Sequence, residues 1–262
     1  MVPAPDLSSS RRRFLTAGLF AFAGLLTGAA IPGGEKPRAK DFTLRLTDGR
    51  ALGAKGFFFH DAYHSIRVLD LMPEPGKYAG FAAAMEEAGA VAGINGGFFT
   101  PEAEPLGLMV TDGRATGALR SSALTSGVWI RTPCVLLLLR VAEFRARRGA
   151  LEPTQLIQSG PFLVDGGNPV AGLEPTQSRP RSLVVHDMRH RWMLIQTPSV
   201  TLAALGEALA REGAVPDVPV VRALNLDGGN SCGWFVAAGN HGRRASSPPL
   251  RRVRNAVAIV PK

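Results

Sequence analysis

Residues 90–99 read Ala-Val-Ala-Gly-Ile-Asn-Gly-Gly-Phe-Phe. The first five residues are small or apolar, which is typical of a short buried strand. The strand then meets Asn95-Gly96, a strong turn dipeptide, and a second glycine follows. A buried strand that opens into a polar, glycine-rich loop predicts a core of short strands. It also predicts a loop whose backbone can approach a ligand closely.

Three further segments have the same character, at residues 158–164, 179–185 and 224–231. They read Gln-Ser-Gly-Pro-Phe-Leu-Val, Arg-Pro-Arg-Ser-Leu-Val-Val and Leu-Asn-Leu-Asp-Gly-Gly-Asn-Ser. Each alone has a structural explanation, because Asp227-Gly228 is a turn dipeptide and Arg181 is a charge typical of an edge strand. Together they offer a carboxylate, guanidinium groups, amides and glycine N–H groups, which suit a polar substrate that carries an anion.

The rest of the chain is rich in predicted strands, separated by turns. Apolar runs or alternation predict strands over residues 42–46, 66–69, 107–111, 128–130, 135–141, 182–185, 192–196, 222–226 and 255–260. Helices are predicted over residues 78–88, ending at Gly89, and over residues 200–211, capped by Ser199 and ended by Gly213. We therefore expect the α+β class, with a strand-rich mixed sheet, about two helices and many Gly-rich turns in one domain over residues 41–262.

The composition fits a loop-rich globular domain. The chain of 262 residues contains 30 glycines and 20 prolines, yet 45% of its residues are hydrophobic, which argues against disorder. The net charge of +9 invites a nucleic-acid partner. However, residues 1–40 hold six basic and two acidic side chains, and the later basic clusters lack interleaved aromatic residues. Nucleic acid is therefore not an expected partner.

The first 40 residues are interpreted as a signal peptide and lead-in. Residues 10–15, Ser-Arg-Arg-Arg-Phe-Leu, resemble a twin-arginine export signal, and a weakly apolar run continues to Ile31. We expect the twin-arginine machinery to export the chain to the periplasm or outside the cell, with an uncleaved membrane anchor as the alternative. A chain exported in the folded state should not depend on a disulfide between Cys134 and Cys232. Two buried thiols are expected, and one disulfide is the alternative.

No metal or other cofactor is expected. His60 and His64, and again His186 and His190, stand four residues apart, a spacing that can share zinc on a helix. The second pair falls in a predicted hairpin turn, so structural or surface histidines are expected at both places. Calcium is the other alternative, with oxygen ligands from Asn225, Asp227 and Asn230.

In this order, the four glycine-rich segments resemble the phosphodiester glycosidase family. The family patterns Asn-Gly-Gly-Phe-Phe, Ser-Gly-Pro-x-Leu-Val, Pro-Arg-Thr-x-x-Gly and Asn-Leu-Asp-Gly-Gly-Gly-Ser have counterparts at residues 95–99, 159–164, 180–182 and 225–231. Residues 254–259 are similar to the family's last strand, so the resemblance spans about residues 65–260. Ser182, Val185 and Asn230 depart from the pattern, standing where the family has threonine, glycine and a third glycine.

The resemblance implies an exported glycoside hydrolase that cleaves the sugar–phosphate bond of sugar 1-phosphodiesters. The sugar would be similar to N-acetylglucosamine, in an envelope polymer or glycan. Because a phosphate monoester leaves readily, charge stabilisation on the phosphate and a carboxylate near the anomeric carbon matter most. Arg181 is assigned to the phosphate, and Asp227 to the carboxylate role, as base or nucleophile. Asn95 is assigned to sugar hydroxyls or to the orientation of Asp227.

The other residues assigned to substrate binding are Gly96, Gly97, Ser159, Gly160, Asn225, Gly228, Gly229 and Asn230. The candidates for a second catalytic carboxylate are Glu102, Glu104 and Asp165. The alternative to an enzyme is a non-catalytic glycan-binding or envelope assembly module with the same site shape.

Overall fold

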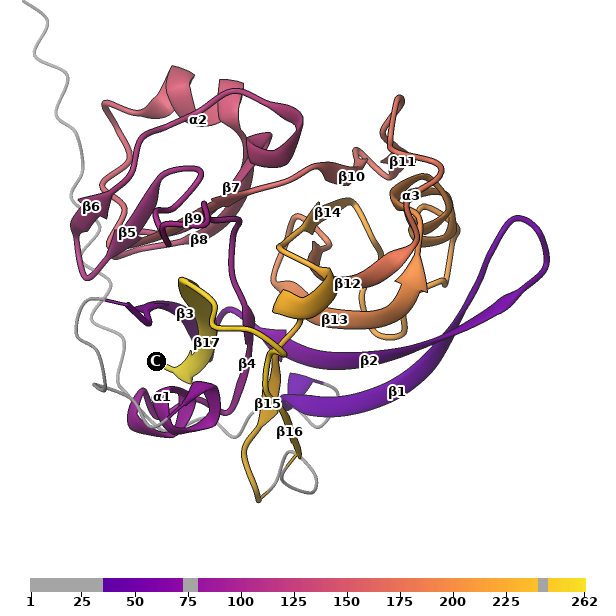
Figure 1. The fold of residues 1–262 in the computed structure, drawn as a ribbon, viewed down its shortest axis with the longest axis horizontal. Helices are drawn as coiled ribbons and strands as arrows, with labels where there is room; N and C mark the ends of the chain where they lie inside the picture. The colour runs from indigo at the N-terminus through magenta and orange to yellow at the C-terminus, as the bar shows by residue number, and fades with distance from the viewer. Residues whose placement is uncertain (1–34, 73–79, 240–244) are drawn as a thin grey trace, which may run out of the picture. The chain divides into compact units, whose positions relative to one another are not determined.

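Three sheets of antiparallel strands organise the protein, as Figure 1 shows. The computed structural model describes residues 35–72, 80–239 and 245–262, so the predicted export signal lies outside the described residues. The described residues belong to one compact unit, Ile31–Lys262. The first sheet has seven strands, in the spatial order β1 (Arg38–Arg45), β2 (Ala51–His60), β13 (Arg191–Val200), β12 (Arg179–His186), β14 (Arg222–Asn225), β10 (Phe162–Asp165) and β11 (Asn168–Pro169).

The other two sheets have five strands each. The second sheet has the order β16 (Ala245–Ser247), β15 (Trp234–Val236), β4 (Ala92–Asn95), β17 (Asn255–Pro261) and β3 (His64–Asp70). The third sheet has the order β6 (Arg114–Thr116), β5 (Met109–Thr111), β9 (Gln155–Ser159), β7 (Gly127–Arg131) and β8 (Leu136–Arg140). The expected strand-rich α+β class is confirmed.

One apolar core, called here the central core, contains residues of all three sheets. The first sheet contributes Phe57 and Trp192, the second Ile94, and the third Trp129 and Ile157, all nearly inaccessible to solvent. Burying each of these large side chains contributes roughly 1.5–3 kcal/mol. Because the strand ends carrying the four motifs emerge from this common core, their loops are brought together in space.

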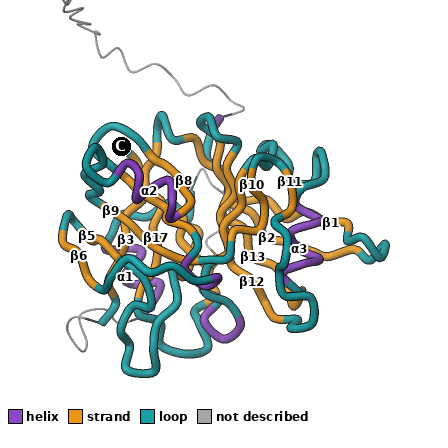
Figure 2. The backbone as a smooth tube through the Cα atoms, turned by 90° about the horizontal axis from the view of Figure 1, so that it is seen from above, coloured by secondary structure: helices purple, strands orange, loops and turns teal. Residues whose placement is uncertain are grey.

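Each sheet carries one helix on its outer face. Helix α1 (Phe81–Glu87) packs Phe81 and Met85 on the second sheet, and α2 (Val141–Arg147) packs Phe144 on the third. Helix α3 (Leu202–Leu209) packs Leu205 and Leu209 on the first sheet. Figure 2 shows α2 beside β8 and α3 beside β1. No helix in the described ranges is long and apolar enough to cross a membrane.

The two predicted helices form, with different boundaries. Helix α1 ends before Gly89, whose φ of 68° suits glycine just after a helix C-cap. Helix α3 is capped by Thr201, whose side chain accepts a hydrogen bond from the Ala204 N–H, so the prediction of Ser199 as the cap was wrong. Strand β13 continues to Val200, and it is the pairing with β12 that delays the helix.

Sequence reasoning missed helix α2 and strand β2. The main-chain N–H of Arg140 donates to the Glu143 side chain at the start of α2, and Arg222 holds Glu143 from another sheet, so a distant residue stabilises this helix. In β2, Phe57 and Phe59 enter the central core, while Phe58 packs on the α3 side. Only the second half of β2, from Gly56 onward, is buried on both faces, and there no alternation of apolar and polar residues marks the strand.

Candidate active site

Asp227 lies at the end of β14, where the chain leaves the central core. The preceding Leu226 is fully buried, and Asp227 itself is only 6% exposed. Its Oδ1 accepts a hydrogen bond of 2.8 Å from the Gly228 N–H, and its Oδ2 lies 3.3 Å from Nη2 of Arg251. Both donors stabilise the negative charge of the carboxylate. A carboxylate held in this way, in the loop that follows a buried strand, can act on a bound substrate.

Asn95 connects the first, third and fourth motifs. It is completely buried, and its Nδ2 donates to the main-chain oxygen of Asp227 over 2.6 Å. Its Oδ1 accepts from Ser182 Oγ at 2.6 Å and from the Gly233 N–H at 3.1 Å. The Asp227 N–H in turn donates to the oxygen of Gly96. Of its two predicted roles, this geometry favours the orientation of Asp227.

Arg181 faces the same cavity as Asp227. It is 7% exposed, with Nε donating to the Val200 oxygen at 3.0 Å and Nη2 to the Gln177 oxygen at 2.6 Å. Burial lowers the pKa of the guanidinium, and the charge of Arg179 lowers it further, but an arginine keeps its charge at any physiological pH. The two backbone contacts fix the planar group in place. Among the described residues, Nη1 and the second hydrogen of Nη2 have no partner, so they can donate to an anion.

One cavity of about 410 Å³ joins the predicted residues with others that the sequence did not reveal. Of the predicted residues, Arg181, Asn225, Asp227 and Gly228 line it. Asn225 donates from Nδ2 to the oxygens of Gly160 and Leu226, while its Oδ1 has no hydrogen-bond partner among the described residues. This orphaned acceptor suits a hydroxyl group of a ligand.

The remaining predicted residues do not line the cavity. Ser159 is buried, and the oxygen of Gly160 is the acceptor for Asn225. The N–H of Gly96 donates to the Asn255 oxygen, and a side chain at Gly97 would meet the Gln158 oxygen at 2.6 Å. The structure therefore corrects the idea that the Gly96 and Gly228 N–H groups are free for an anion. Gly229 and Asn230 form the short helix η3 (Gly229–Ser231) beyond Gly228, outside the cavity lining.

Arg251 is a site residue that sequence reasoning missed. In addition to its contact with Asp227, its Nε donates to Ser231 Oγ at 2.8 Å, and its guanidinium lies 4.8 Å from the centre of the Phe99 ring. In the sequence, Arg251 is marked only by its position in a cluster of arginines. This position does not distinguish Arg251 from its neighbour Arg252, because the contact with Asp227 joins residues 24 positions apart.

The proposed second carboxylates do not line the cavity. Asp165 forms ion pairs with Arg140 at 2.8 Å and Arg222 at 3.0 Å, and neither Glu102 nor Glu104 belongs to the lining. The cavity contains Glu174 instead. Hydrogen bonds from the Thr176 side chain and from the main chain of Thr176 and Gln177 lower the pKa of Glu174. Its carboxylate also shapes the loop whose Gln177 oxygen holds Arg181.

The histidine pairs form a separate polar cluster. His60 ends β2 and His64 starts β3, so this pair lies at a hairpin rather than on a helix. His60 stacks on His190 at 5.2 Å, and His186 stacks on Trp192 at 3.5 Å. In the parts of the chain that the structure describes, no group of three or more His, Cys, Asp or Glu side chains is placed to hold a metal ion.

The structure also fits poorly with a calcium ion at Asp227 and with a disulfide between Cys134 and Cys232. A divalent cation at Asp227 would lie close to the Arg251 guanidinium, which repels it. Cys134 and Cys232 are both free thiols. Cys134 is exposed and Cys232 is half-buried, so the expectation of two buried thiols was wrong. Cys134 lies in the turn between β7 and β8, where two main-chain N–H groups donate to the Thr132 hydroxyl.

Comparisons with known proteins identify the family and the fold. A sequence model described as phosphodiester glycosidase matches residues 88–260. The chain belongs to the phosphodiester glycosidase family. No curated protein matches the sequence.

Solved structures extend the likeness to the fold. The catalytic domain of zebrafish N-acetylglucosamine-1-phosphodiester alpha-N-acetylglucosaminidase, auto-inhibited by its pro-peptide, superimposes with a TM-score of 0.60 at 18% identity, over 86% of this chain and 83% of that one. A hypothetical protein from Synechocystis gives a TM-score of 0.54 at 14% identity, over 84% of this chain and 61% of that one. At these identities the likeness is one of fold.

Proposed function

We propose that this protein is an exported hydrolase that cleaves the bond between the sugar and the phosphate in sugar 1-phosphodiesters. The observation that carries the proposal is the placement of Asp227 and Arg181 on one cavity. The family assignment supports the reaction class, and the name of the zebrafish enzyme suggests an N-acetylglucosamine-like sugar. The twin-arginine motif at residues 10–15 supports export to the periplasm or beyond.

In the proposed reaction, Arg181 binds the phosphate through Nη1 and Nη2. As the bond from the anomeric carbon to the phosphate oxygen breaks, the electron pair leaves with the phosphate monoester. The guanidinium neutralises the growing charge, which lowers the barrier without a strong general acid. Arg179, at the exposed edge of the same cavity, adds a second positive charge.

Asp227 acts on the other side of the breaking bond. It either takes a proton from the water that attacks the anomeric carbon or attacks that carbon itself, with water then releasing the sugar. Gly228 and Arg251 hold its two oxygens in place, and Asn95 fixes its main chain. The free Oδ1 of Asn225 accepts a hydrogen bond from a sugar hydroxyl.

A release assay tests the proposal. The purified chain should liberate sugar from a panel of sugar 1-phosphodiesters that includes N-acetylglucosamine 1-phosphate esters. Asp227→Asn should lower turnover by a factor of about 10³ or more, and Arg181→Ala by a factor of about 10²–10³, as is typical for groups that stabilise transition-state charge. Arg145→Ala, an exposed arginine on α2, is the matched control and should retain full activity.

The alternative of a glycan-binding or assembly module makes a different prediction. If the wild-type chain binds glycans but Asp227→Asn changes the turnover of none of these esters, the enzyme proposal fails. Melting temperatures of all variants must stay close to that of the wild type, so that loss of activity is not confused with unfolding.

A further inference from the structure

Two carboxylates, Asp227 and Glu174, line the cavity that Arg181 faces, and the proposed reaction uses only Asp227. Glu174 lies in the loop between β11 and β12. Its Oε1 accepts hydrogen bonds from the Thr176 N–H at 2.7 Å and from the Thr176 hydroxyl at 2.5 Å. Its Oε2 accepts from the Gln177 N–H at 2.7 Å. Both oxygens of this second carboxylate are therefore bound within its own loop.

These contacts make Glu174 a poor proton donor. The hydrogen bond from the Thr176 hydroxyl lowers the pKa of the Glu174 carboxyl most, and the positive charge of Arg181 lowers it further. Hydrogen bonds to the charged form keep a carboxyl ionised. A general acid near neutral pH needs the opposite, a carboxyl whose pKa is raised. The environment of Glu174 thus favours a structural task in the cavity over proton transfer.

The loop that Glu174 braces carries an acceptor of Arg181. The Gln177 N–H is bound by Glu174, and the Gln177 oxygen accepts from Arg181 Nη2 at 2.6 Å. One residue thus connects the carboxylate to the guanidinium. The main-chain oxygen of Glu174 also accepts from the Ala203 N–H at 3.1 Å, in the first turn of α3. The brace is therefore tied to a helix, so it can hold the Gln177 oxygen in a constant position.

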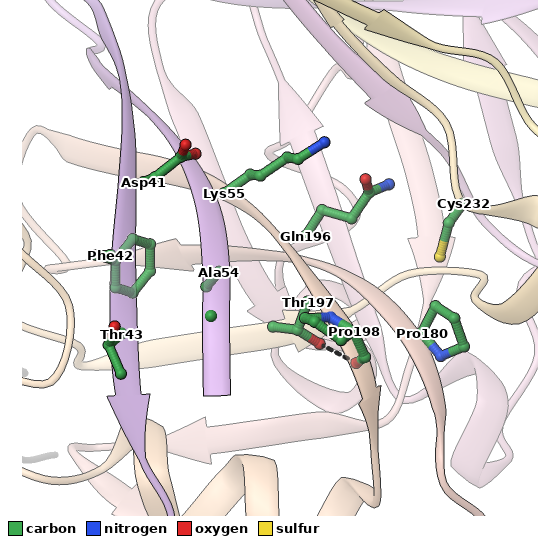
Figure 3. A pocket seen from close by; sticks show the side chains of 11 residues that line it. Asp41, Phe42, Thr43, Ala54, Lys55, Pro180, Gln196, Thr197, Pro198 and Cys232 are labelled. Atoms are coloured by element: carbon green, nitrogen blue, oxygen red, sulfur yellow. Dashed lines mark hydrogen bonds between the residues drawn. The ribbon is translucent and has the colours of Figure 1, made fainter. Parts of the chain in front are cut away.

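The other contact of Arg181 comes from the first sheet. Its Nε donates to the oxygen of Val200, the last residue of β13. Figure 3 shows Pro198 of this strand beside Pro180, the residue before Arg181. The pairing of β12 with β13 thus fixes Nε, whereas the Gln177 oxygen fixes Nη2. A planar guanidinium that is held at only one of these nitrogens can still turn about that contact.

We propose that Glu174 is a positioning residue, which acts through Gln177 to hold Arg181 in the orientation that binds a phosphate. Without the carboxylate, the Gln177 oxygen can turn away, and the guanidinium can rotate about its contact with Val200. Nη1 and Nη2 then no longer face the phosphate for all of the time. The effect on hydrolysis rests on the proposed function, whereas the orientation of Arg181 does not.

A double-mutant cycle tests this route, with the methyl ester of N-acetylglucosamine 1-phosphate as the substrate. Glu174→Ala should lower kcat/KM by about 10–100-fold, because the guanidinium is misplaced. In a protein that already carries Arg181→Ala, the same change should lower kcat/KM by no more than about threefold. Losses that multiply would show independent roles and overturn the positioning role. Glu152→Ala, an exposed glutamate in the loop before β9, is the matched control and should retain full activity.

Glu174→Gln distinguishes positioning from proton transfer. The amide oxygen can still accept from Thr176, but the amide nitrogen cannot accept from the Gln177 N–H. We therefore expect kcat/KM to fall by about 3–10-fold, less than in Glu174→Ala. The pH profile of kcat/KM should keep its wild-type shape, because no proton passes through Glu174. A profile that loses one limb would show an acid–base role and overturn the proposal.

A binding readout needs no turnover. Dimethyl phosphate carries one negative charge and no sugar, and calorimetry can measure its affinity for each variant. Glu174→Ala should weaken this binding about fivefold or more, and the double variant should bind no more weakly than Arg181→Ala. Binding that depends on Arg181 but not on Glu174 would overturn the positioning role, although Asp227-dependent hydrolysis would stand. A coupled loss of binding without hydrolysis of any ester would support the positioning role and overturn the proposed function.

Discussion

Asn95 donates a hydrogen bond of 2.6 Å from Nδ2 to the main-chain oxygen of Asp227, 132 positions further along the chain. Asn95 ends β4 in the second sheet, and Asp227 follows β14 in the first sheet. This one contact therefore ties together the two sheets whose strand ends form the site. Because the acceptor is a main-chain oxygen, the bond sets the position of the Asp227 backbone, while Gly228 and Arg251 contact the carboxylate.

Replacing Asn95 should separate its positioning role from the chemistry. Asn95→Ala leaves the Ser182 hydroxyl and the Gly233 N–H without their buried acceptor, so we expect a loss of about 2–4 kcal/mol in the free energy of unfolding. The folded fraction should show a lower kcat with little change in KM, because Asp227 is misplaced. Urea unfolding and steady-state kinetics measure both effects, and an unchanged kcat would contradict the positioning role.

The contact between Arg251 and Asp227, which the sequence alone did not indicate, can be tested by mutation. Arg251→Ala removes the cation from Asp227 Oδ2 and should reduce kcat/KM by 10-fold or more. Its effect on stability should stay below about 1 kcal/mol, because the arginine side chain is 53% exposed and such pairs contribute little to folding. Arg252→Ala, the adjacent exposed arginine, should behave as the wild type. Equal kinetics for the two variants would remove Arg251 from the site.

Gly228 is expected to tolerate no side chain. In Gly228→Ala, the new Cβ would lie 2.7 Å from the Pro180 oxygen, so the loop of Asp227 must shift. We expect a loss of about 1–3 kcal/mol in stability and a large drop in kcat. Gly149→Ala meets no atom within 4 Å and serves as the matched control. Thermal unfolding and the release assay together measure the outcome. An active, stable Gly228→Ala protein would show that the backbone around Pro180 and Gly228 can move to accept a side chain.

His186 should make the fold sensitive to acid. Burial against Trp192 lowers the pKa of His186 from 6.5 to about 4. Between these two values the unfolded chain binds a proton that the folded chain does not, so stability falls as the pH falls through this window. From pH 7 to pH 5 this single group should cost about 2 kcal/mol in the free energy of unfolding.

Urea unfolding at both pH values measures this contribution. His186→Phe should lose about 2 kcal/mol less than the wild type over that interval. The same pH dependence in wild type and His186→Phe would show that other groups are responsible.

The sequence predicted most strands and the order of the four motifs, because each of these depends on neighbouring residues. Apolar runs that end at glycine and asparagine indicate a strand followed by a turn wherever they occur. Prediction from the sequence failed where residues far away in the chain decide the local structure. Helix α2 depends on Arg222, and Phe57 and Phe58 enter different cores only because a sheet separates them.

The sequence by itself indicated the strand-rich class and the family, and it proposed Asp227, Arg181 and Asn95 as candidate site residues, because these features depend on short contiguous segments. The tertiary structure alone decided which of these residues face the cavity and which hold it together. It placed Arg251 against Asp227 and Glu174 in the cavity lining, and it set Asn95 behind the cavity wall. Such placements arise from strand register and from packing between sheets, which join residues far apart in the chain.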